Sequence, residues 1–269
     1  MILKASHQLP IPARRIISLV PSQTELLFYL GLDTETIGIT KFCIHPSQWH
    51  RNKLRVGGTK NVDIQTIINL NPDLIIANKE ENVKEQVEAL AAHFPVWLTD
   101  VNNLQDALNM IKDIGQLTNR QIPAGELIDD INTNFNQLNE PSTQFHISYS
   151  QLEACYLIWK DPYMTVGSDT FINDMMRRAG FKNIFETKIR YPSITIKEIK
   201  SSNCKFLLLS NEPYPFKQKH LDELQSQLPE IKIILVDGEI FSWYGSRLLQ
   251  APGYFKTLMA HAIAMLNQK

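Results

Sequence analysis

The 269-residue sequence lacks several features that would assign it to a common class of protein. Its three cysteines, Cys43, Cys155 and Cys204, include no CxxC pair, so it encodes neither a zinc ribbon nor a disulfide framework. The net charge is −1 with no run of Lys and Arg, which argues against nucleic-acid binding by phosphate neutralisation. No apolar stretch approaches the roughly 18 residues of a transmembrane helix, so we expect no membrane-spanning segment.

Targeting and catalytic signatures are also missing. The first residues do not form a charged leader followed by an apolar run of about 7–15 residues, so we expect either a cytoplasmic protein or an exported one whose signal has been removed. The sequence contains no G-x-G-x-x-G, G-x-S-x-G or H-E-x-x-H. The Gly-Gly-Thr-Lys at 57–60 lacks the spacing of a phosphate-binding loop. No set of side chains has metal-ligand spacing, so we predict no protein-built metal site.

An amphipathic run is present at 122–138. Apolar residues recur along one side at helical spacing, and acidic and amide residues fill the other side. Pro123 suits the first position of a helix, where the N–H needs no partner. The apolar positions are Leu127, Ile128, Ile131, Phe135 and Leu138. We predict one long helix that connects two parts of the chain.

The sequences on either side of this run repeat one another. Residues 64–80 align with residues 196–212 without a gap, so that Ile67 matches Ile199. In each copy a short helical pattern leads to an apolar strand that ends in polar residues, and a strand–loop–helix unit precedes it. We therefore predict an α/β fold of two lobes with mostly parallel sheets, joined by the connecting helix. The predicted boundaries are 1–120 for the N-terminal lobe, 121–140 for the connecting helix and 141–269 for the C-terminal lobe.

Ligands of open parallel sheets lie beyond the carboxyl ends of the strands. Those ends carry polar and aromatic loops here, which suit a large, flat ligand with polar edges. Residues 139–151 are interpreted as a linker, and the loops of the two lobes are expected to face one another across a cleft. The predicted ligand-binding residues are Ser22, Gln23, Lys41, Phe42, His45, Thr59, Lys60, Asn78, Glu80, Trp159, Tyr163, Glu212, Tyr214, Glu239, Phe241, Trp243, Tyr244 and Arg247.

Some of these residues have another interpretation. Phe241 and Trp243 are also suited to sealing the sheet against the last helix, and Glu80 to a solvated loop. An enzyme that uses Cys43 as nucleophile and His45 as base is a further class of function. It is disfavoured because alternate positions in an extended loop point to opposite sides.

Several motifs resemble a known family. They are residues 15–25 (Arg-Ile-Ile-Ser-Leu-Val-Pro-Ser-Gln-Thr-Glu), Gly-Ile-Thr-Lys at 38–41, Pro46, Val-Gly-Gly-Thr-Lys at 56–60, Asn-Pro-Asp-Leu-Ile-Ile-Ala at 71–77, Gly167 and Gly-Phe-Lys-Asn-Ile-Phe at 180–185. They are similar to the ABC-importer substrate-binding proteins with a helical backbone, the class that carries cobalamin, ferric siderophores and haem. The likeness runs from about residue 14 to the last helix.

This resemblance implies two α/β lobes on one rigid helix and a non-catalytic protein. Such a protein binds a metal chelate, cobalamin or a ferric siderophore, and delivers it to the permease of an ABC importer in the periplasm or cell envelope. It needs no catalytic cofactor, and we expect a monomer. The alternative is a cytoplasmic carrier of a corrinoid-like molecule that has no permease.

The resemblance also carries over to single positions. The cobalamin binders have an aromatic residue near Phe42, which is retained, and tryptophans at the positions of Thr59 and Asn78, which are not. Glu239 and Trp243 fall near the last ligand-binding loop of that family.

Family members also present one acidic residue in each lobe to arginines of the permease. The matching positions are Gln65 and Lys197, so the neighbouring Asp63 and Glu198 become the predicted docking residues.

Overall fold

A computed structural model describes residues 1–3, 5–9, 11–138 and 152–267, and the predicted linker at 139–151 lies outside the described residues. The chain divides into two compact units. The first unit consists of Met1–Val101, Gln105–Asn132 and Tyr244–Leu249; the second consists of Asn102–Leu104, Thr133–Trp243 and Gln250–Lys269. A segment from late in the chain therefore belongs to the first unit.

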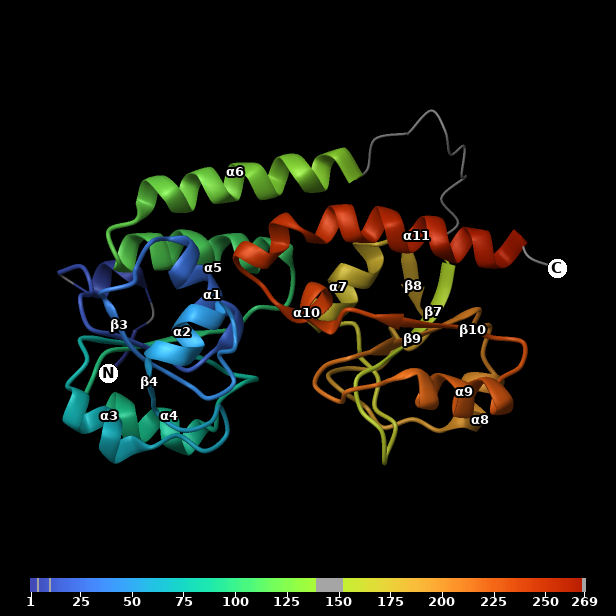
Figure 1. Cartoon of the computed structure of the whole chain (residues 1–269), viewed down its shortest axis with the longest axis horizontal. Coiled ribbons are helices and arrows are strands. Elements are labelled where there is room, and N and C mark those ends of the chain that lie inside the picture. Colours follow the sequence, from blue (N-terminus) through green and yellow to red (C-terminus); the bar gives the residue numbers. More distant parts are fainter. Residues whose placement is uncertain (4, 10, 139–151, 268–269) are drawn as a thin grey trace. The chain divides into compact units, whose positions relative to one another are not determined.

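The described part of the first unit contains a six-stranded sheet in the order β1-β6-β5-β2-β3-β4, with every neighbouring pair parallel (Figure 1). Its strands are β1 (Ile2–Leu3), β2 (Ile16–Ser18), β3 (Thr36–Ile39), β4 (Leu54–Arg55), β5 (Leu74–Asn78) and β6 (Val96–Thr99). Its helical segments are η1 (Ser6–Gln8), α1 (Pro21–Tyr29), α2 (Ser47–Asn52), α3 (Ile64–Leu70), α4 (Lys84–Ala91), most of α5 (Leu104–Leu117), the first part of α6 (Gln121–Leu138) and η2 (Ser246–Leu249).

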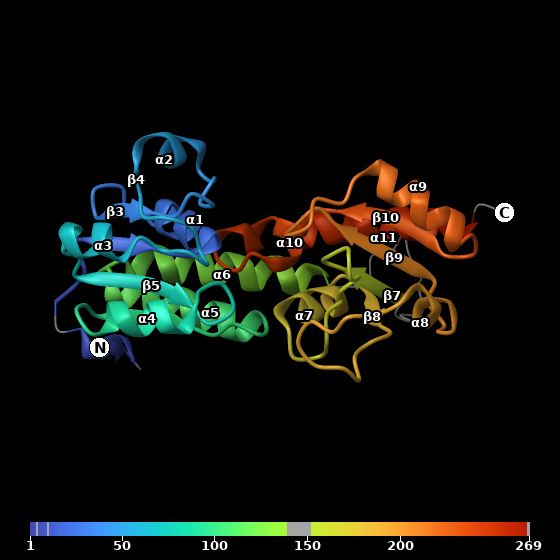
Figure 2. The same ribbon diagram turned by 90° about the horizontal axis from the view of Figure 1, so that it is seen from below.

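One face of this sheet is covered by α3 and α4, which lie beside one another (Figures 1 and 2). Ile75 and Ala77 alternate on that face of β5 and pack in one cluster with Ile67 of α3 and with Val87 and Leu90 of α4. Alternate residues of a strand point to opposite faces, and β5 is buried along its whole length. Parallel strands enclosed on both faces read as continuous apolar runs, as this one does.

The second unit contains a four-stranded sheet in the order β10-β9-β7-β8, again parallel throughout its described strands. Its strands are β7 (Leu152–Leu157), β8 (Phe181–Asn183), β9 (Phe206–Ser210) and β10 (Lys232–Val236). Its helices are α7 (Phe171–Arg178), α8 (Ile196–Lys200), α9 (Gln218–Gln227), α10 (Gly238–Ser242) and α11 (Ala251–Asn267), together with the end of α6.

The two faces of the second sheet have different cores. Under α8 and α9, the aliphatic side chains Ile199 and Leu224 pack with Leu207 and Leu209 of β9. The other face carries an aromatic row in which the Phe241 ring centroid lies 5.2 Å from that of Tyr156 and 5.1 Å from that of Phe255 in α11. Figure 1 shows α11 on one side of these strands and α8 and α9 on the other.

The predicted repeat is confirmed in register. Strands β5 and β9 occupy matching positions in the alignment, and both are fully buried. Ile67 and Ile199 each have 0% of their surface exposed. The residues that precede the two helices, Asp63 and Thr195, also match, and each side chain accepts a hydrogen bond from a backbone N–H in the first turn.

The long helix is confirmed as α6, with Leu127, Ile131 and Phe135 buried along one stripe. It begins at Gln121, so Pro123 is its third residue rather than its first. This position is tolerated because none of the first N–H groups of a helix has an intrahelical partner. Among the residues that the structure describes, no helix combines the length and hydropathy of a membrane crossing.

Candidate ligand-binding loops

The loops that follow β2, β3, β4 and β5 lie at one edge of the first sheet, because the four strands are parallel neighbours or near neighbours. These loops, the end of β5 and the first turn of α1 carry the predicted ligand-binding residues Ser22, Gln23, Lys41, Phe42, His45, Thr59, Lys60, Asn78 and Glu80. The structure thus brings these nine residues to the same edge of one sheet. They differ widely in exposure, which separates residues that shape the loops from residues that a ligand can reach.

Gln23 and Asn78 lie beneath the loops rather than on them. The Gln23 side chain is fully buried and its Nε2 donates to the hydroxyl of Thr99 at 2.6 Å. Asn78 is 2% exposed, and its Nδ2 donates to the carbonyl and the hydroxyl of Thr99 at 3.2 and 3.1 Å. Its Oδ1 accepts from the N–H groups of Glu80 and Glu81. Buried amides that satisfy several backbone groups hold a loop in one conformation.

Asn82 completes this network. Its Oδ1 accepts from the Asn78 N–H at 2.8 Å, and its Nδ2 donates to the carbonyls of Leu19 and Thr59 at 3.3 and 3.1 Å. One side chain therefore links the ends of three loops. Thr59, itself 8% exposed, is held through its main chain.

Phe42 is the large aromatic residue that this edge exposes, with 52% of its surface accessible. The Lys41 ammonium lies 5.2 Å from the centre of its ring. A Cβ at Gly58 would lie 3.1 Å from Phe42 Cε2, and one at Gly57 would lie 2.5 Å from the Asn61 carbonyl oxygen. Gly58 therefore allows the loop after β4 to pass against the Phe42 ring, and Gly57, with a φ of +94°, allows that loop to turn closely on its own backbone.

Tyr244 belongs to the late segment Tyr244–Leu249 of the first unit, where two acidic residues, Glu81 and Glu80, act on its phenol. Burial raises the pKa of the Tyr244 phenol, and the carboxylates of Glu81 and Glu80 raise it further. Burial also raises the pKa of the Glu81 carboxyl, and the positive charge of Lys60 partly offsets this rise. The Lys60 ammonium donates to the Glu80 carbonyl and so ties the loop after β4 to the loop after β5.

Arg247 is engaged by α1. Its Nη2 and Nε donate to the two carboxylate oxygens of Glu25 at 2.8 and 3.1 Å, and the side chains are 12% and 19% exposed. A Cβ at Gly245 would lie 3.2 Å from Leu26 Cβ, and its φ of +123° also favours glycine. The segment Tyr244–Leu249 is therefore packed closely on α1. Glu25 was not predicted as a partner, because residues so far apart in sequence share no local pattern.

The second unit presents its own aromatic group at the carboxyl ends of β7 and β9. Trp159 is 40% exposed, and its ring meets that of Tyr214 edge-on at 5.6 Å. The Tyr214 hydroxyl lies 3.4 Å from His220 Nε2. Burial raises the pKa of the Tyr163 phenol, and the nearby Lys160 ammonium partly offsets this rise. The predicted residues Trp159, Tyr163 and Tyr214 therefore belong to neighbouring loops of one sheet.

Other predicted residues of this unit are less accessible. Trp243 is 7% exposed and its indole N–H donates to a carboxylate oxygen of Glu212 at 3.1 Å. Phe241 is fully buried in the aromatic row beneath α11. Glu239 stands in the first turn of α10, where its N–H donates to Asp237. Phe241 thus packs between the sheet and the last helix, as its alternative interpretation predicts, and a ligand cannot reach it.

The predicted docking residues are exposed or half-buried at the starts of the two repeated helices. The Asp63 carboxylate accepts from the N–H and hydroxyl of Thr66, which lowers its pKa. Glu198 pairs with Lys188 at 3.0 Å and accepts from Thr195, and both contacts lower its pKa. Lys197 is exposed.

Cys43 does not suit nucleophilic chemistry. It is fully buried, with Sγ 3.0 Å from the Thr24 hydroxyl and 3.2 Å from that of Thr40. Burial raises its pKa, so the thiol stays protonated. In the described part of the chain, no three His, Cys, Asp or Glu residues are grouped so as to hold a metal ion.

A family model described as periplasmic binding protein matches residues 16–232. The chain belongs to this family. Its members are substrate-binding transport proteins, so the prediction that the chain is not an enzyme is confirmed. The predicted resemblance and the two-lobed α/β class are confirmed as well.

Two curated relatives illustrate the likeness. An uncharacterized ABC transporter substrate-binding lipoprotein, YvrC of Bacillus subtilis (strain 168), is 25% identical over 197 residues, which are 71% of this chain and 61% of that protein. A vitamin B12-binding protein of Vibrio campbellii (strain ATCC BAA-1116) is 25% identical over 191 residues, which are 70% of this chain and 67% of the relative. The chain thus aligns with about three-fifths to two-thirds of their lengths.

Solved structures share the fold. The periplasmic vitamin B12-binding protein BtuF of Vibrio cholerae superposes with a TM-score of 0.77 at 20% identity, covering 93% of this chain and 98% of that one. A possible iron-binding periplasmic protein of Staphylococcus epidermidis ATCC 12228 has the same TM-score and coverage at 25% identity.

Proposed function

We propose that this chain binds a metal chelate, cobalamin or a ferric siderophore, and delivers it to an ABC importer without catalysing a reaction. Family membership supports the transport role. The relatives named as vitamin B12-binding proteins and the possible iron-binding protein support the class of ligand. Transport from outside the cytoplasmic membrane would place the protein in the cell envelope.

The observation that carries the proposal is the supported, exposed ring of Phe42. A flat apolar face beside a cation suits one face of a macrocycle or an aromatic chelate whose edge is polar. The second unit offers a comparable surface in Trp159, backed by Tyr214. Because the chelator holds the metal, the protein needs no metal ligands of its own.

The partner in this proposal is the permease of the importer. Asp63 and Glu198 lie at the starts of the repeated helices α3 and α8, and their lowered pKa values keep both carboxylates charged. Charge reversal at both positions is expected to reduce ligand uptake by cells that carry the importer and to leave the affinity for the ligand unchanged.

Thermal unfolding with added ligand tests the proposed function. Cyanocobalamin, a ferric hydroxamate and haem are added separately to the protein; a ligand at 100 times its Kd stabilises the folded state by about 2.7 kcal/mol. We expect a rise in Tm with cyanocobalamin or the ferric hydroxamate, together with quenching of Trp159 fluorescence. Phe42→Ala should abolish most of the rise, whereas the control Ile44→Ala, at a 43% exposed position of the same loop, should not.

Absence of any rise, or a rise with haem alone, would contradict the choice of ligand. An equal loss with Phe42→Ala and Ile44→Ala would contradict the role of the aromatic ring.

A further inference from the structure

Strands β6 and β10 occupy equivalent positions in the two sheets, but only β6 has a further strand paired with its outer edge among the described residues. Val96 of β6 pairs with Ile75 of β5, and Ile233 of β10 pairs with Leu207 at the position of β9 that matches Ile75. In the first unit the outer edge of β6 is covered by β1, where the Val96 N–H donates to the Met1 carbonyl at 2.9 Å. Among the described residues of the second unit, no strand pairs with the outer edge of β10.

The backbone of β10 is arranged to accept such a strand. The Lys232 N–H donates to the Lys205 carbonyl at 2.9 Å, and the Val236 carbonyl accepts from Asn211 at 3.3 Å, so even-numbered residues bond toward β9. Successive residues of a strand alternate in direction, so the N–H and C=O groups of Ile233 and Leu235 point to the open edge. These are the groups that an added strand would bond.

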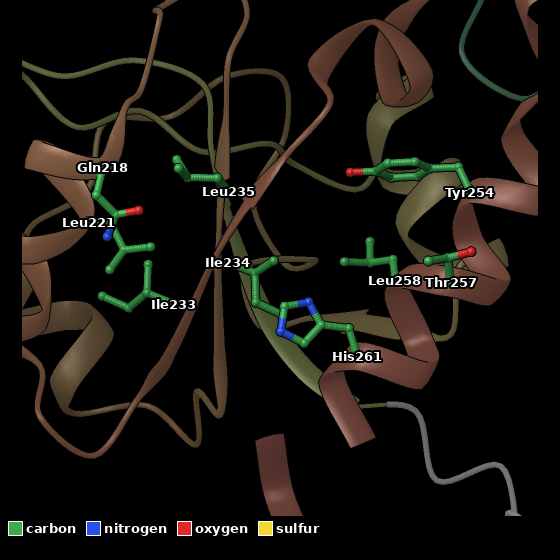
Figure 3. Close-up of a pocket in the computed structure, with 9 residues that line it drawn as sticks. All are labelled: Gln218, Leu221, Ile233, Ile234, Leu235, Tyr254, Thr257, Leu258 and His261. Carbon is green, nitrogen blue, oxygen red and sulfur yellow. The ribbon is translucent and has the colours of Figure 1, made fainter. Parts of the chain in front are cut away.

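A groove of about 350 Å³ runs along this edge (Figure 3). Leu221 of α9 lies on the side of Ile233 and Leu235, whereas Leu258 and His261 of α11 lie on the side of Ile234 (Figure 3). The groove therefore spans both faces of the sheet, so it can receive side chains that alternate along an extended segment. None of its lining residues is Asp, Glu, Lys or Arg, which favours an uncharged occupant.

We propose that the edge of β10 binds an extended, uncharged apolar segment of a partner polypeptide, which adds to the sheet as a parallel strand. Strand β1, which covers the equivalent edge of β6, is the model for this segment. It is parallel to β6, and its residues Leu3 and Ile2 are 3% and 37% exposed. Addition of a strand to an open sheet edge is an established mode of peptide recognition. The proposal does not depend on the proposed ligand.

The groove argues against pairing between two copies of β10. Its walls come from both α9 and α11, so the edge is recessed between two helices. A second sheet edge would bring its own two helices into the same position, whereas a single extended segment would not.

The test uses a fluorescent, end-capped peptide, Met-Ile-Leu-Thr-Val-Thr, which begins with the residues that cover β6. We expect saturable binding to the full chain by fluorescence anisotropy. Leu235→Pro removes one outward N–H and leaves the bonds to β9 intact, as proline on an edge strand does. It should weaken binding about tenfold, the equivalent of one lost hydrogen bond, while the matched control Leu235→Ala changes the affinity by less than about threefold.

Two further measurements keep the test decisive. Thermal unfolding shows whether Leu235→Pro is folded; if it is not, a peptide N-methylated at its Leu is compared with the parent peptide on the unaltered protein. Equal affinity for these two peptides, equal binding by Leu235→Pro and Leu235→Ala, or no saturation up to about 1 mM would overturn the proposal. A dimer that Leu235→Pro dissociates in sedimentation would also overturn it, because the occupant would be a second copy.

Discussion

The two units share an arrangement of four parallel strands but support the loops at the strand ends with different side chains. Each has four parallel strands in one order, β6-β5-β2-β3 in the first and β10-β9-β7-β8 in the second. Beneath the loops of the first, a network of amides and hydroxyls centred on Asn78 satisfies the backbone, whereas the second uses the Trp243–Glu212 hydrogen bond and the ring of Tyr214. The duplicated core constrains the strands, and the loop ends have diverged.

The largest expected effect tests the equivalence of the cores. Ile67→Ala and Ile199→Ala each remove a fully buried side chain at matching positions, so each should lower the free energy of unfolding by about 2–5 kcal/mol in urea denaturation. Ile122→Ala, at a 77% exposed position, is the control and should change it by less than about 0.5 kcal/mol. A small cost at one matching position and a large cost at the other would break the equivalence.

The next prediction concerns the point where the units diverge. Asn78 and Ser210 end the matching strands. Asn78 bonds Thr99 and two backbone N–H groups, whereas the Ser210 hydroxyl donates to the Glu212 carbonyl and accepts from the Glu212 N–H. Asn78→Ala leaves several buried groups unpaired and should cost about 2–3 kcal/mol, against about 1 kcal/mol for Ser210→Ala. Urea denaturation of both variants measures the difference, and equal costs would show that the network adds nothing.

The exposed aromatics of the two units allow a comparison of ligand binding. Phe42→Ala and Trp159→Ala are each expected to weaken chelate binding about tenfold or more, as central aromatic contacts do, with little change in Tm because both rings are exposed. Isothermal titration with the chelate found by thermal shift measures both. Loss in only one variant would assign the site to that unit alone.

The smallest effect concerns pH. The pKa of Asp63 lies below its usual 3.8 and that of Glu198 below its usual 4.5, so each contributes stability that is present above those values and lost as the pH falls through the lower, folded-state pKa. Asp63→Asn and Glu198→Gln should therefore each lower the Tm slightly at neutral pH, and this difference should shrink and vanish as the pH falls through the lowered, folded-state pKa of each carboxyl. A Tm difference that persists in acid would show that charge is not the cause.

Much of the fold could be predicted because its signals are local. The stripe of Leu127, Ile131 and Phe135 predicts α6, and the repeat predicts β5 and β9 in register. Strands β1 and β4 were not predicted, because two residues carry no periodicity. Asn82 and Thr99 were missed as supports of the loops, since only their hydrogen bonds to other segments distinguish them from ordinary polar residues.

The sequence by itself determined the duplicated α/β pattern and the polar and aromatic loops at the strand ends, because spacing along the chain sets which residues a helix or strand buries. Only the tertiary structure decided which loop residues are accessible: Phe42 and Trp159 are exposed, whereas Gln23, Asn78 and Phe241 are buried. It also decided that Arg247 pairs with Glu25 in the first unit. Exposure and pairing depend on residues that are distant in the chain, so they exist only once the strands have assembled.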